Sequence, residues 1–253
     1  MDEETIMMPV VFVGHGSPMN AIEDNQFTRT WRKLSDKLPI PKCIVCISAH
    51  WLTRDTYTSN EEHPQQIYDM YGFPPELYAL SYQPPGSKLY AKKIQEELGI
   101  EVQNDWGIDH GTWSVLTHMY PQADIPVVQL SIDMTKPYQE HYDLGKKLRN
   151  LRDDGVLIIG SGNIVHNLRL IDWNRQGGFH WAEEFDAYIR DCILRSDHQA
   201  VMEHPMSPAV PSTDHFLPLL YVLGASNIID QIEVFNEACL MGSLSMTGYL
   251  FHR

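Results

Sequence analysis

Five of the twelve histidines in the chain lie beside small or turn-forming residues. Three of them, His15, His50 and His166, each follow a short apolar run. The other two are His110, in a Gly-flanked turn, and His215, at the start of an apolar segment. Neutral imidazole is the commonest metal ligand, and histidine also exchanges protons near neutral pH. Any one of these histidines alone is typical of a loop or core residue, but their recurrence predicts a shared metal site.

The elements that must position these histidines alternate between strands and helices. Short runs rich in valine and isoleucine predict strands over 9–13, 44–48, 126–132, 155–160, 232–235 and 243–251. Apolar residues at helical spacing predict helices over 27–38, 88–98, 138–151 and 181–194. This alternation is typical of an α/β fold. We therefore expect a single domain over residues 1–253, with a central, mainly parallel or mixed sheet flanked by helices.

Such a fold would bring distant histidines together. In open α/β sheets, ligands bind beyond the carboxyl ends of the strands. His15, His50 and His166 are each expected at such an end, so we expect them to converge although they are far apart in the sequence. The segment 68–82 is rich in tyrosine, phenylalanine and proline, and it is interpreted either as a wall or lid of the pocket or as a packed surface loop.

The composition excludes several classes of partner. The formal net charge of −14 disfavours binding to nucleic acid or to anionic membranes. The acidic start of the chain is unlike a signal peptide, and no apolar run reaches the roughly 20 residues of a membrane span. We therefore expect a cytoplasmic protein. Cys43 and Cys46 lie on a predicted strand and face opposite sides of it, which favours buried cysteines over a redox or zinc site.

Several catalytic motifs are missing from the sequence. The glycines at 160 and 162 lack the rest of a dinucleotide-binding fingerprint, and no phosphate-binding loop with Gly-Lys-Ser/Thr is present. Neither Ser17 nor Ser161 lies in a Gly-x-Ser-x-Gly elbow, and there is no His-Glu-x-x-His helix of the zinc protease type. The histidines therefore remain the strongest functional signal.

Five short motifs together resemble a known family. They are Gly-His-Gly-Ser-Pro at 14–18, Ser-Ala-His-Trp at 48–51, Asp-His-Gly-Thr-Trp at 109–113, Gly-Asn-Ile-Val-His-Asn-Leu at 162–168 and Asp-His-Phe-Leu-Pro-Leu at 214–219. Their order and content resemble the DOPA 4,5-dioxygenase family of class III, LigB-type extradiol ring-cleavage dioxygenases. The resemblance covers nearly the whole chain and implies a LigB-like α/β fold.

The resemblance also implies a role for each motif histidine. His15 and His50 match the two metal ligands at strand ends, and His215 matches the third ligand in this branch of the superfamily. A glutamate commonly completes the site elsewhere in the superfamily, so Asp214 is a rival for the third position. His166 matches a residue that acts either as a further metal ligand or as an acid–base group.

His110 matches a catalytic histidine near the substrate. The implied reaction is cleavage of a catechol such as L-DOPA by O₂ at a mononuclear non-haem metal site, giving a muconic semialdehyde, which is a seco-DOPA when the substrate is L-DOPA. Fe(II) is the metal expected for activity, and Zn(II) is an alternative occupant. Two other functions stay open: a zinc-dependent hydrolase on the same fold, and a non-catalytic metal-binding member of the superfamily. The sequence leaves the physiological catechol, the ring bond cleaved and the oligomeric state undecided.

Overall fold

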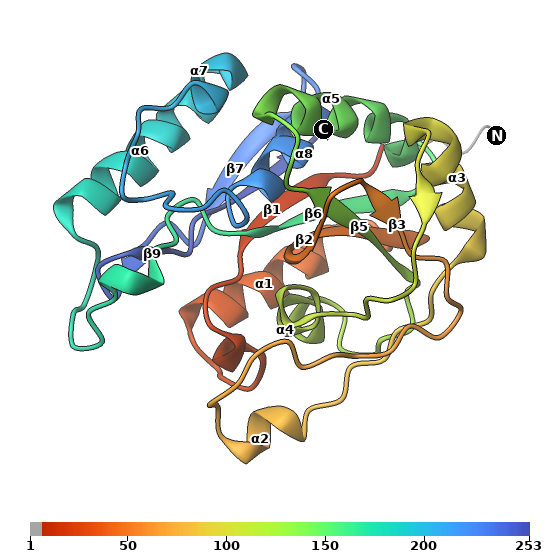
Figure 1. Cartoon of the computed structure of the whole chain (residues 1–253), viewed down its shortest axis with the longest axis horizontal. Coiled ribbons are helices and arrows are strands. Elements are labelled where there is room, and N and C mark those ends of the chain that lie inside the picture. The colour runs from red at the N-terminus through yellow and green to blue at the C-terminus, as the bar shows by residue number, and fades with distance from the viewer. Residues whose placement is uncertain (1–6) are drawn as a thin grey trace.

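An eight-stranded sheet crosses the middle of the computed structural model, which describes residues 7–253 (Figure 1). Its strand order is β4-β3-β5-β2-β6-β1-β10-β7. The four central strands run parallel: β5 (Val127–Asp133), β2 (Cys43–Thr53), β6 (Val156–Gly162) and β1 (Val10–Gly14). β10 (Gly248–His252) and β7 (Gln231–Phe235) extend one edge in antiparallel fashion, and β3 (Tyr57–Thr58) and β4 (Glu101–Val102) form the other edge. The predicted mixed α/β sheet is therefore confirmed.

Helices cover both faces of this sheet, which explains why its strands are apolar on both sides (Figure 1). One layer contains α5 (Tyr138–Leu148) and α8 (Leu217–Ala225), and the opposite layer contains α1 (Gln26–Lys37) and α4 (His110–Met119). Successive residues of one strand pack on opposite faces of the sheet. Phe12 lies in the core under α5 and α8, and Val11 lies in the core on the other face. This alternation is the two-residue period of a strand.

The first layer also contains α3 (Lys88–Leu98), α6 (His180–Leu194) and α7 (His198–Met202). As predicted, α3 covers residues 88–98. The side chain of its cap residue Ser87 accepts the backbone N–H of Tyr90, and the helix ends at Gly99, which lies in the left-handed region with φ 69°. The predicted helix over 138–151 ends earlier, and the 3₁₀ segment η2 (Arg149–Arg152) completes it.

Two predictions about the elements are corrected by the structure. The strand predicted over 243–251 is divided into β9 (Leu244–Ser245) and β10, because β9 pairs with β8 (Cys239–Leu240) in a separate small sheet. The turn predicted around His110 is instead the first turn of α4. α4 is buried on nearly all sides, so its sequence lacks the amphipathic pattern by which a surface helix is recognised.

The cysteines are structural, as predicted. Cys43 packs in the core under α5 and α8, Cys46 packs in the opposite core, and neither forms a disulfide. Burial raises the pKa of both thiols to about 12. The thiolate that redox chemistry or zinc binding needs is therefore disfavoured. Within residues 7–253, every helix is too short or too polar to cross a membrane.

Candidate metal centre

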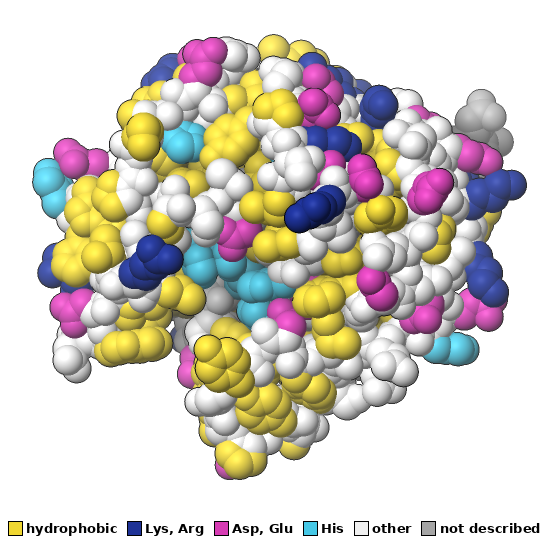
Figure 2. Space-filling model, in the orientation of Figure 1, with side chains coloured by type: hydrophobic (Ala, Val, Ile, Leu, Met, Phe, Trp, Pro, Cys, Tyr) yellow, Lys and Arg dark blue, Asp and Glu magenta, His cyan; other side chains and the backbone are white. Residues whose placement is uncertain are grey.

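One cavity of about 390 Å³ collects all five motif histidines. They are His15, His50, His110, His166 and His215. Figure 2 shows histidine side chains in a hollow that is bordered by hydrophobic and other uncharged groups, with acidic side chains beside the histidines. The structure therefore confirms the predicted convergence of the histidines that follow the strands.

The strands β1 and β2 deliver the first two histidines. His15 directly follows β1, and its backbone N–H donates to the carbonyl of Gly162 at the end of β6 (3.0 Å). His50 lies within β2, where the pairing with β5 shifts register between Ile47 and Leu52. A register shift of this kind re-aims side chains along a strand. The strand β2 is therefore longer than the strand predicted over 44–48, and His50 lies in its irregular part.

Three further segments deliver the remaining histidines. His110 is the first residue of α4. His166 follows β6 and forms an isolated antiparallel bridge with Leu244. His215 lies two residues before α8, and its carbonyl accepts the backbone N–H of Asn163 (2.9 Å). His215 therefore stands just before a buried helix, at the start of the apolar segment.

The side chains that could hold a metal ion form two adjoining groups. In the N-terminal trio (His15, His50 and His110), one ligand atom from each residue lies within 4.8 Å of the others. The same holds for the C-terminal trio, which is His166, Asp214 and His215. The ring centroids of His15 and His215, one from each trio, are 5.3 Å apart.

The two histidines from β1 and β2 have a spacing suited to a shared ion. The Nε2 atoms of His15 and His50 are 3.3 Å apart. Two nitrogen ligands that are each about 2.1 Å from one ion lie roughly 3.0–3.4 Å apart. The donor set and this spacing therefore fit a divalent transition metal.

A hydroxyl group on β6 sets the tautomer of His15. Ser161 Oγ lies 3.0 Å from His15 Nδ1 and donates its single proton to the carbonyl of Gly111 (2.5 Å). Ser161 must therefore accept from His15, so that Nδ1 carries the hydrogen and Nε2 keeps its lone pair. An outer partner that leaves the second nitrogen free is the usual support of a histidine metal ligand.

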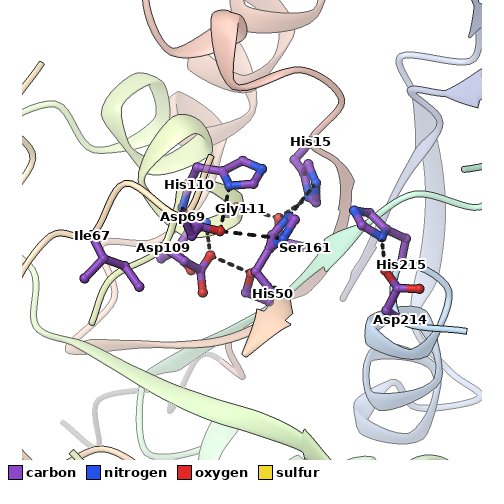
Figure 3. A network of polar contacts seen from close by, with 12 residues as sticks. His15, His50, Ile67, Asp69, Asp109, His110, Gly111, Ser161, Asp214 and His215 are labelled. Atoms are coloured by element: carbon purple, nitrogen blue, oxygen red, sulfur yellow. Dashed lines mark hydrogen bonds and ion pairs between the residues drawn. The ribbon is translucent and has the colours of Figure 1, made fainter. Parts of the chain in front are cut away.

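A carboxylate from the segment 68–82 supports two of the histidines (Figure 3). Asp69 accepts the backbone N–H of His110 (2.9 Å) and the Nδ1–H of its ring (2.8 Å). The same carboxylate lies 3.6 Å from Nδ1 of His50. His110 is therefore held with Nε2 free.

The C-terminal trio is held by more local contacts. Asp214 accepts the Nδ1–H of His215 (2.6 Å), and the rings of His166 and His215 stack with centroids 3.4 Å apart. Figure 3 shows the Asp214–His215 pair facing His15 and His50 from the other side of the site. In this arrangement Asp214 supports a neighbouring ring.

Burial keeps most of these rings neutral. Loss of solvent, reinforced by the neighbouring histidines, lowers the pKa of His15 and His215 well below the ordinary value. Burial and then His110 lower the pKa of His50 to about 3, although Asp69 opposes this shift. Burial lowers the pKa of His166 to about 4. The neutral ring is the form that binds a metal.

Asp109 has a structural role at the start of α4. It accepts hydrogen bonds from the backbone N–H of Thr112, from Ser48 Oγ (2.6 Å) and from Trp106 Nε1 (2.9 Å). Burial raises its pKa to about 6. The ring of His110 is instead oriented by Asp69, which lies 41 residues away in the sequence.

Sequence reasoning missed two supporting residues, Asp69 and Ser161. Asp69 had one indirect signal, since it lies in the segment interpreted as a wall of the pocket. Met70 and Phe73 of that segment line the cavity, so this interpretation is confirmed. Ser161 had no signal, because its role depends on the pairing of β6 with β1 and on the position of α4.

Known proteins resemble this chain over nearly its whole length. The family described as "Catalytic LigB subunit of aromatic ring-opening dioxygenase" matches residues 9–251. A protein of Escherichia coli K12 named "4,5-DOPA dioxygenase extradiol" is 46% identical, covering 94% of this chain and 93% of its own length. A protein of the same name from Beta vulgaris is 34% identical over 99% of both chains.

A solved structure supports the fold. The crystal structure of an uncharacterized protein from Escherichia coli K12 superimposes with a TM-score of 0.83 and 39% sequence identity. The match covers 96% of this chain and 99% of the other. The likeness therefore extends over nearly the whole chain.

Proposed function

The chain belongs to the LigB family of aromatic ring-opening dioxygenases, and from this premise we propose that it is an extradiol dioxygenase of catechols. It would cleave the aromatic ring with O₂ at a mononuclear non-haem metal centre and release a muconic semialdehyde. L-DOPA, the substrate in the names of the relatives, is the first catechol to test, with a seco-DOPA as its product. We expect the reaction to take place in the cytoplasm.

The observation that carries this proposal is the meeting of five histidines, from five separate segments, in one cavity. We propose that His15, His50 and His215 hold the metal, with His166 beside them as a further ligand or acid–base group. Their contacts support these roles, since Nε2 of both His15 and His215 is left free by a hydrogen bond at Nδ1. Fe(II) would supply open positions for a catechol and O₂, whereas Zn(II) would supply an activated water.

His110 is suited to move a proton. Its Nδ1–H is held by Asp69, so Nε2 faces the cavity as an acceptor for the proton of a catechol hydroxyl. The Asp69 carboxylate would stabilise the imidazolium that forms, as the acidic residue does in an Asp–His pair of a hydrolase. Asp69 is in this account a positioning residue.

Oxygen uptake tests the proposal. Protein loaded anaerobically with Fe(II) is mixed with L-DOPA and a panel of simple catechols, and O₂ consumption is measured beside the absorbance of the yellow ring-cleavage product. We expect one O₂ consumed for each catechol opened. No O₂ uptake with any catechol, together with hydrolysis of an ester or amide by the Zn(II) form, would favour the hydrolase instead.

A further inference from the structure

A second cavity, of about 480 Å³, lies apart from the metal centre, and the described residues that line the two cavities do not overlap. The lining of the second cavity includes Phe251 of β10, which pairs with Val10 at the start of β1. His15 follows the other end of β1. The two cavities therefore lie toward opposite ends of the sheet.

Three segments enclose the second cavity: α5 with η2, α7, and the residues 226–232 between α8 and β7. Helices α5 and α7 lie along the same edge of the molecule in Figure 1. The hydroxyl of Tyr142 on α5 lies 3.0 Å from Nδ1 of His198 on α7, so a hydrogen bond joins the two helices beside the cavity. The cavity is therefore a product of tertiary structure, and no sequence motif marks it.

Arg149 contributes a guanidinium without a carboxylate partner to this cavity. Its Nη2 donates to the carbonyl of Gly224 (2.7 Å), and within residues 7–253 its Nε has no hydrogen-bond partner. Ion pairs among the described residues engage Lys146 and Arg152, but not Arg149. Because a guanidinium offers five donors in a fork that matches a carboxylate or a phosphate, Arg149 has donors left for an anion.

Lys146, one turn before Arg149, adds a second positive charge. Its ammonium lies over the ring of Tyr142 and pairs with Asp143 (2.9 Å), a residue outside the lining. Both side chains of that pair are about half exposed, and exposed pairs contribute little, so Lys146 can turn to a bound anion. The pKa of His198 is lowered by burial and then by Arg149, with Lys146 adding to the shift, so both cations act on the cavity.

The two carboxylates of the lining offset these cations only in part. Asp230 accepts hydrogen bonds from both Nη atoms of Arg152 (2.7 and 3.1 Å), and both side chains are fully buried. Asp197 caps α7 by accepting the backbone N–H of Ala200 (3.1 Å). With Asp230 neutralised by Arg152, two cations face one carboxylate. The cavity is therefore locally positive in a chain whose formal net charge is −14.

We propose that this cavity is a second ligand site, for a small organic anion. Arg149 and Lys146 would bind its carboxylate or phosphate group, because charge-assisted and bidentate hydrogen bonds to such groups are the strong ones. The carbon body of the anion would pack against Met202 and Ile232, which line the same cavity and are only partly buried. The inference is independent of ring cleavage, since no residue of the metal centre takes part.

Three probes of similar shape test the site. Zn(II)-loaded protein is titrated calorimetrically with 3-phenylpropionate, with phenyl phosphate and with the neutral 3-phenylpropanamide. We expect saturable binding of an anion, at least about tenfold tighter than binding of the amide, because the amide cannot form the charged hydrogen bonds. The tighter of the two anions identifies the preferred acidic group. No saturable binding of either anion, or an amide that binds equally well, would overturn the inference.

Variants assign the binding to this cavity. Arg149→Gln should weaken the anion by about tenfold or more, and Lys146→Gln by about threefold. Lys147→Gln, at an exposed neighbour outside the lining, is the matched control and should leave the affinity unchanged. Because Arg149 also holds the end of α8, the exposed Lys146 keeps the test valid if Arg149→Gln unfolds.

A variant of the catalytic cavity completes the test. Phe73→Ala changes the lining of the metal centre and should leave the affinity for the anion unchanged. If Phe73→Ala weakens the anion and Lys146→Gln does not, the probes bind at the metal centre and the inference is wrong.

Discussion

The two trios that meet in the cavity are built in different ways. In the N-terminal trio, the supports of His15 and His110 come from distant parts of the chain, Ser161 and Asp69. In the C-terminal trio, His215 is supported by the adjacent Asp214 and by stacking on His166. The N-terminal trio is therefore complete only in the folded protein, whereas a part of the C-terminal trio is present in the local sequence.

This contrast explains how much of the site could be predicted. The motif histidines are visible in the sequence because they stand beside small or turn-forming residues and at the ends of apolar runs. Asp214 is visible because it precedes His215 in one of the family motifs. Asp69 and Ser161 are not visible, because they lie 41 and 146 residues from the rings they orient. Their roles depend on how the strands are arranged in the folded sheet. The spacing of residues along the sequence does not specify that arrangement.

The fold was predictable to a similar extent. The central strands and the helices α1, α3, α5 and α6 follow from apolar runs and helical spacing, and the structure confirms them. Helix α4 escaped prediction because it is buried on nearly all sides. The separation of β9 from β10 escaped because the pairing of β9 with β8 is a tertiary feature. Buried helices and short strands carry no periodic signal of their own.

The largest effect is expected from replacing the proposed metal ligands. It tests whether residues of both trios hold the same ion. His15→Ala and His215→Ala should each abolish stoichiometric metal binding, because each removes one of the proposed ligands. Metal content is measured by elemental analysis after loading and dialysis, with His63→Ala as the matched control outside the cavity. If His215→Ala keeps its metal and His110→Ala loses it, the ion belongs to the N-terminal trio alone.

The next effect separates chemistry from metal binding within the N-terminal trio. His110→Ala should keep its metal and still bind catechol, while turnover falls by roughly 10²–10⁴-fold, because a proton acceptor is lost. The pH–rate profile should also lose one limb. Turnover within a few-fold of the parent, with an unchanged profile, would show that His110 only packs against Trp113, whose ring centroid lies 6.4 Å from its own.

A smaller effect is expected when the carboxylate that supports His110 is replaced. Asp69→Asn should lower turnover by roughly 10–100-fold and change the acidic limb of the pH–rate profile, because the carboxylate no longer stabilises a protonated ring. The exposed Asp36→Asn serves as a control of equal charge change. A normal profile with only a lower melting temperature would mean that Asp69 merely stabilises the fold.

A substitution of His166 tests whether this residue is a metal ligand or an acid–base group. His166→Gln keeps a polar side chain of similar length but removes the ring that stacks on His215. If His166 is a ligand, metal affinity should fall together with turnover, and if it is an acid–base group, turnover alone should fall. Metal titration and steady-state kinetics on the same preparation discriminate between these roles, and neither value changing would remove His166 from the site.

The smallest expected effect concerns the support of His15. Ser161→Ala removes the acceptor for Nδ1–H but leaves the ring in place, so metal affinity should fall by about tenfold with little loss of turnover at saturating metal. Competition with a chelator gives the affinity, and Ser35→Ala on the surface of α1 is the control. An unchanged affinity would show that the tautomer of His15 needs no support from β6.

The most direct test of the central claim uses dioxygen labelled with the heavy oxygen isotope. Fe(II)-loaded protein and a catechol that it turns over are mixed under the labelled gas, and the ring-opened product is trapped by reduction and examined by mass spectrometry. Reduction keeps the newly formed aldehyde oxygen from exchanging with water. We predict that both atoms of one O₂ appear in the product. Label in only one position, or product oxygen derived from water, would contradict an extradiol dioxygenase at this centre.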